Sequence, residues 1–269
     1  IREEFHDVST GTNIRAYHTF PAPPDFANRL RVHLLELLDP LVARLGFPER
    51  RWDACPFRGL SMFGLEHAPI YFGREQAVCD VQLALREQAR KGCASVLIVG
   101  ASGSGKSSLA RAGVLARLTQ DSFDPEVQTW LTSVLVPGAQ DRMPCFSLAE
   151  ALVSDGALPE LSECDQDLLD LAGALAIDPA LVVNHRLKPA IIKAGQGKPG
   201  SARLFLLVDQ MEEVLTDPNA DEEAATRLFA AIDALARSGV AWVLMTVRSD
   251  FYTRCQSFPV LMAMTEGAG

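Results

Sequence analysis

The sequence has no apolar run that approaches the length of a membrane-spanning helix. Its first ten residues, IREEFHDVST, also lack the architecture of a signal peptide. Both absences predict a cytoplasmic protein without a membrane partner. The sequence begins without methionine and ends in MTEGAG, so we expect it to be a segment of a longer protein.

Basic residues are scarce as well. The 269 residues include 25 lysines and arginines against 34 aspartates and glutamates, which gives a net charge of −9. Proteins that bind nucleic acid usually carry an excess of positive charge that neutralises phosphates. The charge balance therefore argues against direct binding of DNA or RNA by this segment.

The six cysteines form no C-x-x-C pair and have no histidine at a ligand spacing, which argues against a zinc site. We interpret them as reduced, mostly buried thiols. Hydrophobic residues make up 48% of the sequence, which suits one large globular domain or one domain with appendages.

The stretch SVLIVGASGSGKSSLARAGV, residues 95–114, carries the clearest chemical signal. It opens on a strand pattern, continues through small residues and ends in a helix pattern. From Gly100 to Ser107 it matches G-x-x-x-x-G-K-S, the fingerprint of a phosphate-binding loop. Because strand, loop and helix follow in the required order, the stretch predicts that the chain binds a nucleoside triphosphate.

The residues of this loop have distinct expected roles. Its three glycines let backbone N–H groups converge on the phosphates. Lys106 is expected to reach the β- and γ-phosphates, and the Ser107 hydroxyl to bind Mg²⁺. The expected nucleotide-binding residues of the loop are Gly100, Ala101, Ser102, Gly103, Ser104, Gly105, Lys106, Ser107 and Ser108.

A second feature of the site follows the apolar run RLFLLVD, residues 203–209. Such a run is typical of a strand buried on both faces, and Asp209 falls at its carboxyl end. We expect Asp209 to hold Mg²⁺, and Glu212 or Glu213 to act as general base on the attacking water. The alternative is an ordinary buried strand followed by the acidic first turn of a helix.

The apolar run VAWVLMTVR, residues 240–248, repeats this arrangement and ends in Arg248. In a parallel sheet Arg248 would lie at the same edge as the phosphate-binding loop, where its guanidinium could contact the γ-phosphate. That contact would distinguish a triphosphate from a diphosphate. The alternative is an ordinary ion pair with Asp250 or Glu213.

Strand and helix patterns alternate along the chain, as a parallel sheet flanked by helices requires. The fold class is therefore expected to be α/β. The expected strands are 95–99, 130–136, 203–209 and 240–248, and the expected helices lie in 75–90, 146–154, 165–193 and 221–237, besides the helix after the phosphate-binding loop.

Four motifs in order resemble those of the STAND NTPases, the signal-transduction ATPases with numerous domains. They are CPFRGLSMFGLEHAPIYFGREQAV, VGASGSGKSSLARAGVL, LLVDQMEEVLT and VLMTVRSDFYTRC, which together cover roughly residues 55–265. The resemblance is closest to the bacterial branch that is often fused to protease, TIR-like or WD-repeat partners. It implies a P-loop NTPase of the additional-strand, AAA+-like class, related to immune receptors of the NLR type.

The resemblance also implies roles by position. Within YFGRE, residues 71–75, the Arg74 region would border the nucleotide base and ribose. Asp209 and the two glutamates after it match the Mg²⁺ and water-activating positions, and Arg248 matches the γ-phosphate sensor. Met211 stands where an aromatic residue is expected, a change that should alter packing more than chemistry.

We expect two domains, of which the resemblance covers only the second. Residues 51–269 would form the nucleotide-binding domain, without the carboxyl-terminal arm and repeat sensor that family members carry. Residues 1–50 would be the tail of an N-terminal effector domain or a linker helix. The stretch 26–47 supports a helix, because it repeats apolar residues at helical spacing around Pro40.

The function implied is a regulatory ATPase that binds ATP or ADP with Mg²⁺. ADP would hold a closed monomer, ATP would permit homo-oligomerisation and activation of a fused effector, and slow hydrolysis would reset the switch, in bacterial antiphage defence or programmed cell death. The alternatives are a non-hydrolysing, nucleotide-dependent scaffold and a metabolic kinase or AAA+-like DNA-loading ATPase. Glu212 and Glu213 argue against the scaffold, and the acidic charge argues against DNA loading.

Overall fold

The computed structural model describes residues 52, 55–59, 61–120, 124, 127–138, 144–162, 165–197, 200–216 and 222–265, and before them residues 6–7, 12–13, 30, 33–34 and 38. The chain divides into two compact units, Ile1–Arg51 and Trp52–Gly269. The boundary alone does not test the assignment of the first unit to an effector tail or linker helix, which stays a prediction.

In the first unit, strands β1 (His6–Asp7) and β2 (Thr12–Asn13) pair antiparallel. Residues 30, 33, 34 and 38 are helical, and the remainder of the expected helix 26–47 lies outside the described residues. Across the described part of the whole chain, no helix combines the length and apolar character that crossing a membrane requires.

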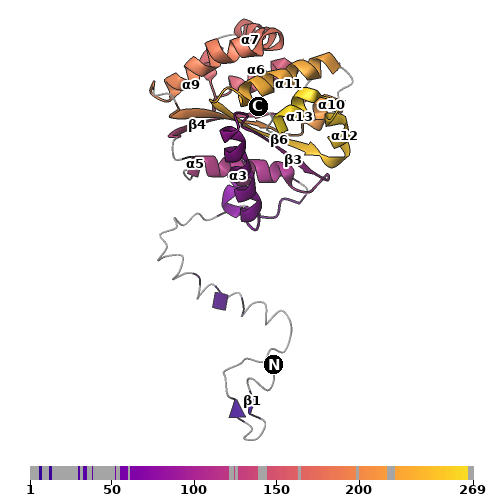
Figure 1. Ribbon diagram of the computed structural model, residues 1–269. Helices are drawn as coiled ribbons and strands as arrows, with labels where there is room; N and C mark the ends of the chain where they lie inside the picture. The colour runs from indigo at the N-terminus through magenta and orange to yellow at the C-terminus, as the bar shows by residue number, and fades with distance from the viewer. Residues whose placement is uncertain are drawn as a thin grey trace. The chain divides into compact units, whose positions relative to one another are not determined.

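Four parallel strands form the centre of the described second unit (Figure 1). They are β3 (Ser95–Gly100), β4 (Thr129–Leu135), β5 (Ala202–Val208) and β6 (Ala241–Arg248), within one residue of the predicted bounds. The order in the sheet is β3-β6-β5-β4. Strand β6 is thus inserted between β3 and β5, as the additional-strand class requires.

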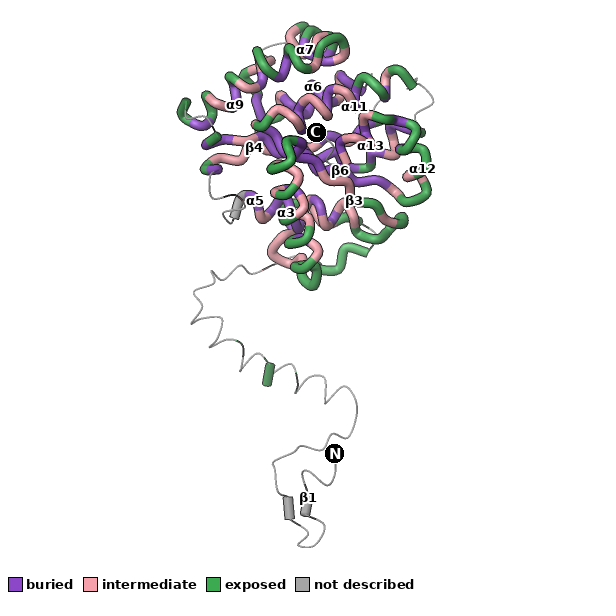
Figure 2. Tube along the Cα trace, in the orientation of Figure 1, coloured by how far each residue is buried: buried purple, intermediate pink, exposed green. Residues whose placement is uncertain are grey.

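Side chains of the two central strands alternate between two apolar layers, as the two-residue period of a strand dictates. Phe205 and Leu207 of β5 and Trp242 and Leu244 of β6 belong to the first layer. The residues between them belong to the second, larger layer. Figure 2 shows these strands as the most buried part of the unit. Burial on both faces explains why β5 and β6 are mostly apolar and do not alternate with polar residues.

Helices cover both faces of the sheet (Figure 1). The first layer is covered by α3 (Glu75–Arg90) and by the helix after the loop, which comprises α4 (Lys106–Ser108), a π-helical segment (Leu109–Leu115) and α5 (Ala116–Gln120). The second layer is covered by α6 (Pro144–Leu152), α7 (Asp165–Ile177), α8 (Pro179–Val182), α9 (Lys188–Ala194), α11 (Glu222–Ala236) and α13 (Pro259–Thr265). Two short helices, α10 (Glu212–Thr216) and α12 (Tyr252–Cys255), follow the carboxyl ends of β5 and β6.

The helix predictions are confirmed, most closely for 75–90. Within the expected helical stretch 165–193, the chain breaks at Asp178, whose carboxylate accepts a hydrogen bond of 2.9 Å from Leu181 N and so caps α8. Pro179 occupies the first turn of that helix, where its missing N–H leaves no bond unmade.

Five of the six cysteines are described, and all five are free thiols. Cys93, Cys145 and Cys255 are buried, whereas Cys55 and Cys79 are exposed. Burial raises the pKa of the Cys255 thiol to about 11, so this residue contributes packing rather than a thiolate at neutral pH. Cys164 lies outside the described residues.

Candidate functional site

The phosphate-binding loop follows β3 at the carboxyl edge of the sheet, where ligands of open parallel sheets bind. Gly103 and Gly105 adopt positive φ angles of 71° and 83°, which residues with a side chain rarely adopt. A Cβ atom at Gly100 would lie 2.9 Å from the Ser104 hydroxyl. The glycines of the motif are therefore needed for the path of the loop itself.

Lys106 folds back over this loop. Its ammonium donates hydrogen bonds of 2.8 Å to the Gly100 carbonyl and 2.9 Å to the Ala101 carbonyl. The cation is thereby held beside the backbone that would surround the phosphates. The loop thus combines a fixed positive charge with the amino end of a helix, and both attract anions.

Asp209 lies directly after β5 and is 1% exposed. Its Oδ1 accepts hydrogen bonds of 2.8 Å from the hydroxyls of Ser107 and Thr246, and its Oδ2 accepts one of 2.8 Å from Arg111 Nε. The structure therefore brings the two expected Mg²⁺ ligands, Ser107 and Asp209, into contact. A hydroxyl beside a carboxylate is a donor set of hard oxygens that fits Mg²⁺ completed by phosphate oxygens and water.

The chain turns sharply after Asp209. Gln210 has a φ of 59°, a strained value for a residue with a side chain, and Thr246 holds it there. The Thr246 hydroxyl accepts from Gln210 N at 2.9 Å, and the Thr246 carbonyl accepts from Met211 N at 2.9 Å. This turn places Glu212 and Glu213 at the start of α10. Met211 is fully buried in the second apolar layer.

The two glutamates differ in their surroundings. Glu212 Oε2 accepts a hydrogen bond of 3.2 Å from the backbone N–H of Arg248. Burial raises the pKa of Glu213, and the negative charges of Glu212 and Asp209 raise it further. A Cβ atom at Gly138 would lie 3.1 Å from Glu213 Cβ, so this glycine lets the chain after β4 approach Glu213 closely.

Arg248 pairs with Asp250. Its Nε donates to Asp250 Oδ1 at 3.2 Å, a second bond joins the same two groups, and the guanidinium lies 5.5 Å from the centre of the Phe251 ring. The ion pair raises the pKa of Arg248 and lowers that of Asp250. Both side chains are exposed, 40% and 53%. This is one of the two ion pairs that the sequence offered as the alternative for Arg248.

One pocket of about 740 Å³ collects most of these groups. Its lining includes Ser102, Gly103, Gly105, Lys106, Ser107 and Ser108 from the loop. The turn after Asp209 adds Gln210, Glu212 and Glu213, and the end of β6 adds Thr246 and Arg248. The volume lies in the range of small-ligand sites. Segments far apart in the sequence thus meet at a single site.

Five expected residues are absent from the described lining, among them Asp209, which is buried and bonds to the lining residues Ser107 and Thr246. Gly100, Ala101 and Ser104 contribute to the path of the loop beneath it. Arg74 is exposed at the residue before α3, and its assignment to the base and ribose stays a prediction.

Sequence reasoning missed several contributors, among them Arg111 and Thr246. Arg111 lies four residues after Ser107, so helical spacing could have placed both on one face. Thr246 is a polar residue within an apolar run, a signal of a buried hydrogen bond. Gly59, Ser61, Met62 and Phe63 also line the pocket, and Phe63 N donates to Ser108 Oγ at 3.0 Å, but these residues show no periodicity that would have revealed them.

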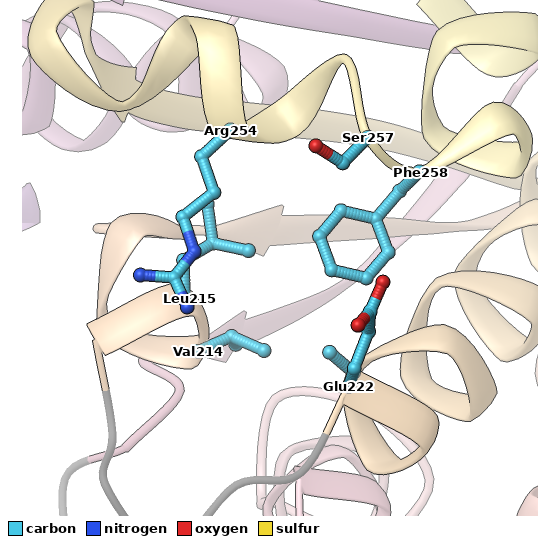
Figure 3. Close-up of a pocket in the computed structure, with 7 residues that line it drawn as sticks. Val214, Leu215, Glu222, Arg254, Ser257 and Phe258 are labelled. Atoms are coloured by element: carbon cyan, nitrogen blue, oxygen red, sulfur yellow. The ribbon is translucent and has the colours of Figure 1, made fainter.

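A second, smaller pocket of about 180 Å³ lies between α10, α11 and the residues after β6 (Figure 3). Val214, Leu215, Ala225 and Phe258 form its apolar part, and Glu222 and Arg254 are its charged residues. It contains no part of the phosphate-binding loop.

Within the described ranges, no group of three or more histidine, cysteine, aspartate or glutamate side chains could hold a metal ion.

The inserted strand β6 and the loop between β3 and α4 define a P-loop NTPase of the additional-strand class. A model of the novel STAND NTPase 1 family (nSTAND1) matches residues 56–268. The chain belongs to this family, which confirms the resemblance seen in its motifs, and it is accordingly a nucleotide-binding, nucleotide-dependent NTPase. No curated protein matches the chain.

Two solved structures show a distant likeness. PCH-2 of C. elegans has a TM-score of 0.33 and 17% identity, over 64% of this chain and 37% of that chain. EccC of Thermomonospora curvata (ATPases 2 and 3), in complex with a signal sequence peptide, has a TM-score of 0.36 and 19% identity, over 66% of this chain and 29% of that chain. The chain spans well under half of either protein.

Proposed function

We propose that this chain is a regulatory ATPase whose bound nucleotide controls oligomerisation and the activation of a fused effector, in bacterial antiphage defence or programmed cell death. Membership of the STAND family supports the signalling role. The observation that carries the ATPase role is the single pocket shared by the loop, the acidic turn and Arg248. A switch additionally requires that ATP and ADP stabilise different shapes, because a nucleotide that binds both equally shifts nothing.

The residues divide the work of hydrolysis between binding and proton transfer. The loop amides and Lys106 bind the phosphates of ATP, and Ser107 with Asp209 would hold Mg²⁺, which supplies charge neutralisation when bound. Glu213 orients the attacking water and accepts its proton. Its raised pKa suits that task, because a general base works best when its pKa is near the operating pH. Glu212 instead braces the end of β6 through the Arg248 N–H.

Arg248 would report the γ-phosphate by exchanging partners. In the structure its guanidinium is held by Asp250 at the pocket rim. Exposed ion pairs contribute little to stability, whereas a charge-assisted bond to phosphate is strong. Contact with the γ-phosphate of ATP would therefore release Arg248 from Asp250. ADP has no γ-phosphate and would leave this ion pair in place.

Arg248→Ala is expected to lower the affinity for ATP by about ten- to a hundredfold and to leave the affinity for ADP within about twofold. Parallel calorimetric titrations with a non-hydrolysable ATP analogue and with ADP measure both. Arg237→Ala is the matched control, because Arg237 also pairs with an acid but precedes the amino end of β6, away from the pocket. Equal losses of affinity for ATP and for ADP would contradict the proposal and leave Arg248 only the structural ion pair with Asp250.

The proposed function itself is tested by phosphate release and by the mass of the particle in ATP and in ADP, on a protein that includes the neighbouring domains. Slow turnover with a larger particle only in ATP is the expected result. Assembly without turnover would favour the scaffold, and phosphate transfer to an added small-molecule acceptor would favour the kinase. Stimulation by DNA would favour the DNA-loading ATPase.

A further inference from the structure

Asp209 is held on both oxygens in this structure. Ser107 and Thr246 donate to Oδ1, and Arg111 donates to Oδ2 at 2.8 Å. Both hydroxyl donors line the nucleotide pocket, whereas Arg111 approaches from the helix behind the loop. The two oxygens of the Asp209 carboxylate therefore have different partners: Oδ1 is bonded to the two hydroxyls, and Oδ2 is bonded to Arg111.

The local structure explains why Arg111 reaches Asp209. It follows Ser107 by four residues on a continuous helical segment, so both side chains project toward the carboxyl end of β5. The segment Leu109–Leu115 is π-helical. This geometry is rare in proteins, and where it occurs it often lies at a functional site. The side chain of Arg111 is 18% exposed and that of Asp209 is 1% exposed, so solvent screens their attraction little.

A buried carboxylate needs a compensating charge. The other cations of the site are engaged elsewhere, since Lys106 bonds to loop carbonyls and Arg248 bonds to Asp250. Arg111 is the basic residue that forms an ion pair with Asp209 among the described residues. Its bond to Oδ2 also prevents rotation of the carboxylate, because Oδ1 is fixed at the same time by two hydroxyls.

We propose that Arg111 is a positioning residue for the metal site: it compensates the charge of buried Asp209 and keeps Oδ1 beside the Ser107 hydroxyl, in the orientation that Mg²⁺ requires. This inference rests on the proposed function, because it takes Ser107 and Asp209 as the Mg²⁺ ligands. Partners that orient the ligands of a metal typically change its affinity by 10- to 100-fold when removed.

The first test compares ADP binding with Mg²⁺ and with EDTA by calorimetry, so that no turnover is involved. The ratio of the two affinities is the benefit that Mg²⁺ provides. Arg111→Met, which keeps an unbranched, mostly aliphatic side chain and removes the guanidinium with its charge, is expected to reduce this benefit by about tenfold and to leave the affinity in EDTA unchanged. Arg111→Lys is expected to retain part of the benefit. An unchanged benefit in Arg111→Met would overturn the proposal.

The second test is thermal unfolding without nucleotide and in EDTA. Arg111→Met is expected to lower the Tm by about 10 °C, because it leaves a buried charge unpaired. The double variant Arg111→Met/Asp209→Asn is expected to recover most of that loss, since the charge is gone. Additive losses in the double variant would reduce Arg111 to a packing residue. A wild-type protein that gains no ADP affinity from Mg²⁺ would instead contradict the proposed function, whatever the Tm values show.

Discussion

Lys106→Ala is expected to lower the affinity for ATP by about 100-fold or more. The variant removes the cation that the structure holds beside the Gly100 and Ala101 carbonyls, at the point where the β- and γ-phosphates would lie. Each charge-assisted hydrogen bond to a phosphate is roughly twice as strong as a neutral one. Losing two or more of them at once accounts for the size of the effect.

Equilibrium binding of a fluorescent ATP analogue measures this loss. Lys91→Ala is the matched control, because Lys91 forms an exposed ion pair with Glu87 between α3 and the amino end of β3, at the edge of the sheet opposite the loop. Its affinity for ATP should equal that of the wild type. Retained ATP affinity in a folded Lys106→Ala protein would remove the basis for placing the phosphates at this loop.

Glu213→Gln is expected to lower ATP turnover by about 100- to 1000-fold while ATP binding stays intact. The amide keeps the size of the side chain but cannot accept a proton, and general-base catalysis typically contributes a factor of this order. Single-turnover phosphate release, with ATP affinity measured on the same preparation, separates the two effects.

Two comparisons make this result specific to Glu213. Glu212→Gln is expected to have a smaller effect on turnover, because an amide oxygen can still accept from the Arg248 N–H. The pH profile adds an independent measure. Burial and two neighbouring negative charges raise the pKa of Glu213. On acidification, wild-type turnover should therefore begin to fall at a pH above the pKa of an ordinary glutamate. This acid limb should be absent from the residual activity of Glu213→Gln. A larger loss in Glu212→Gln would assign the base to Glu212.

The sheet was predictable from sequence because its central strands are buried on both faces. That burial gave β5 and β6 runs that are apolar except for Arg203, Thr246 and the terminal Arg248, and their bounds were predicted to within one residue. The P-loop was predictable for a different reason: its backbone needs glycine at positions of positive φ, which leaves a fixed spacing in the sequence. Both signals are local, and neither depends on a partner elsewhere in the chain.

The groups that organise the site depend on distant partners and escaped prediction. Arg111 meets Asp209 across 98 positions, and Thr246 meets it across 37. Helical spacing shows that Arg111 shares a face with Ser107, but only the pairing of β5 with β6 shows what lies opposite. The distinction between Glu212 and Glu213 likewise needed the turn at Gln210, whose positive φ no residue type announces.

The pairing of β6 with its two neighbouring strands limits how Arg248 could respond to a γ-phosphate. Gly100 is paired with Arg248, and β6 is paired with a strand on each side. Trp242 and Leu244 belong to the first apolar layer, and Val243 and Met245 belong to the second. A slip of β6 by one residue would move each of these side chains to the opposite layer, so β6 cannot slide in small steps. The partner exchange proposed for Arg248 is therefore confined to rotation about its side-chain bonds, which exposed residues complete in picoseconds to nanoseconds. A nucleotide-dependent step observed in milliseconds would then report a movement of larger elements. The proposed exchange of partners by Arg248 would precede that movement.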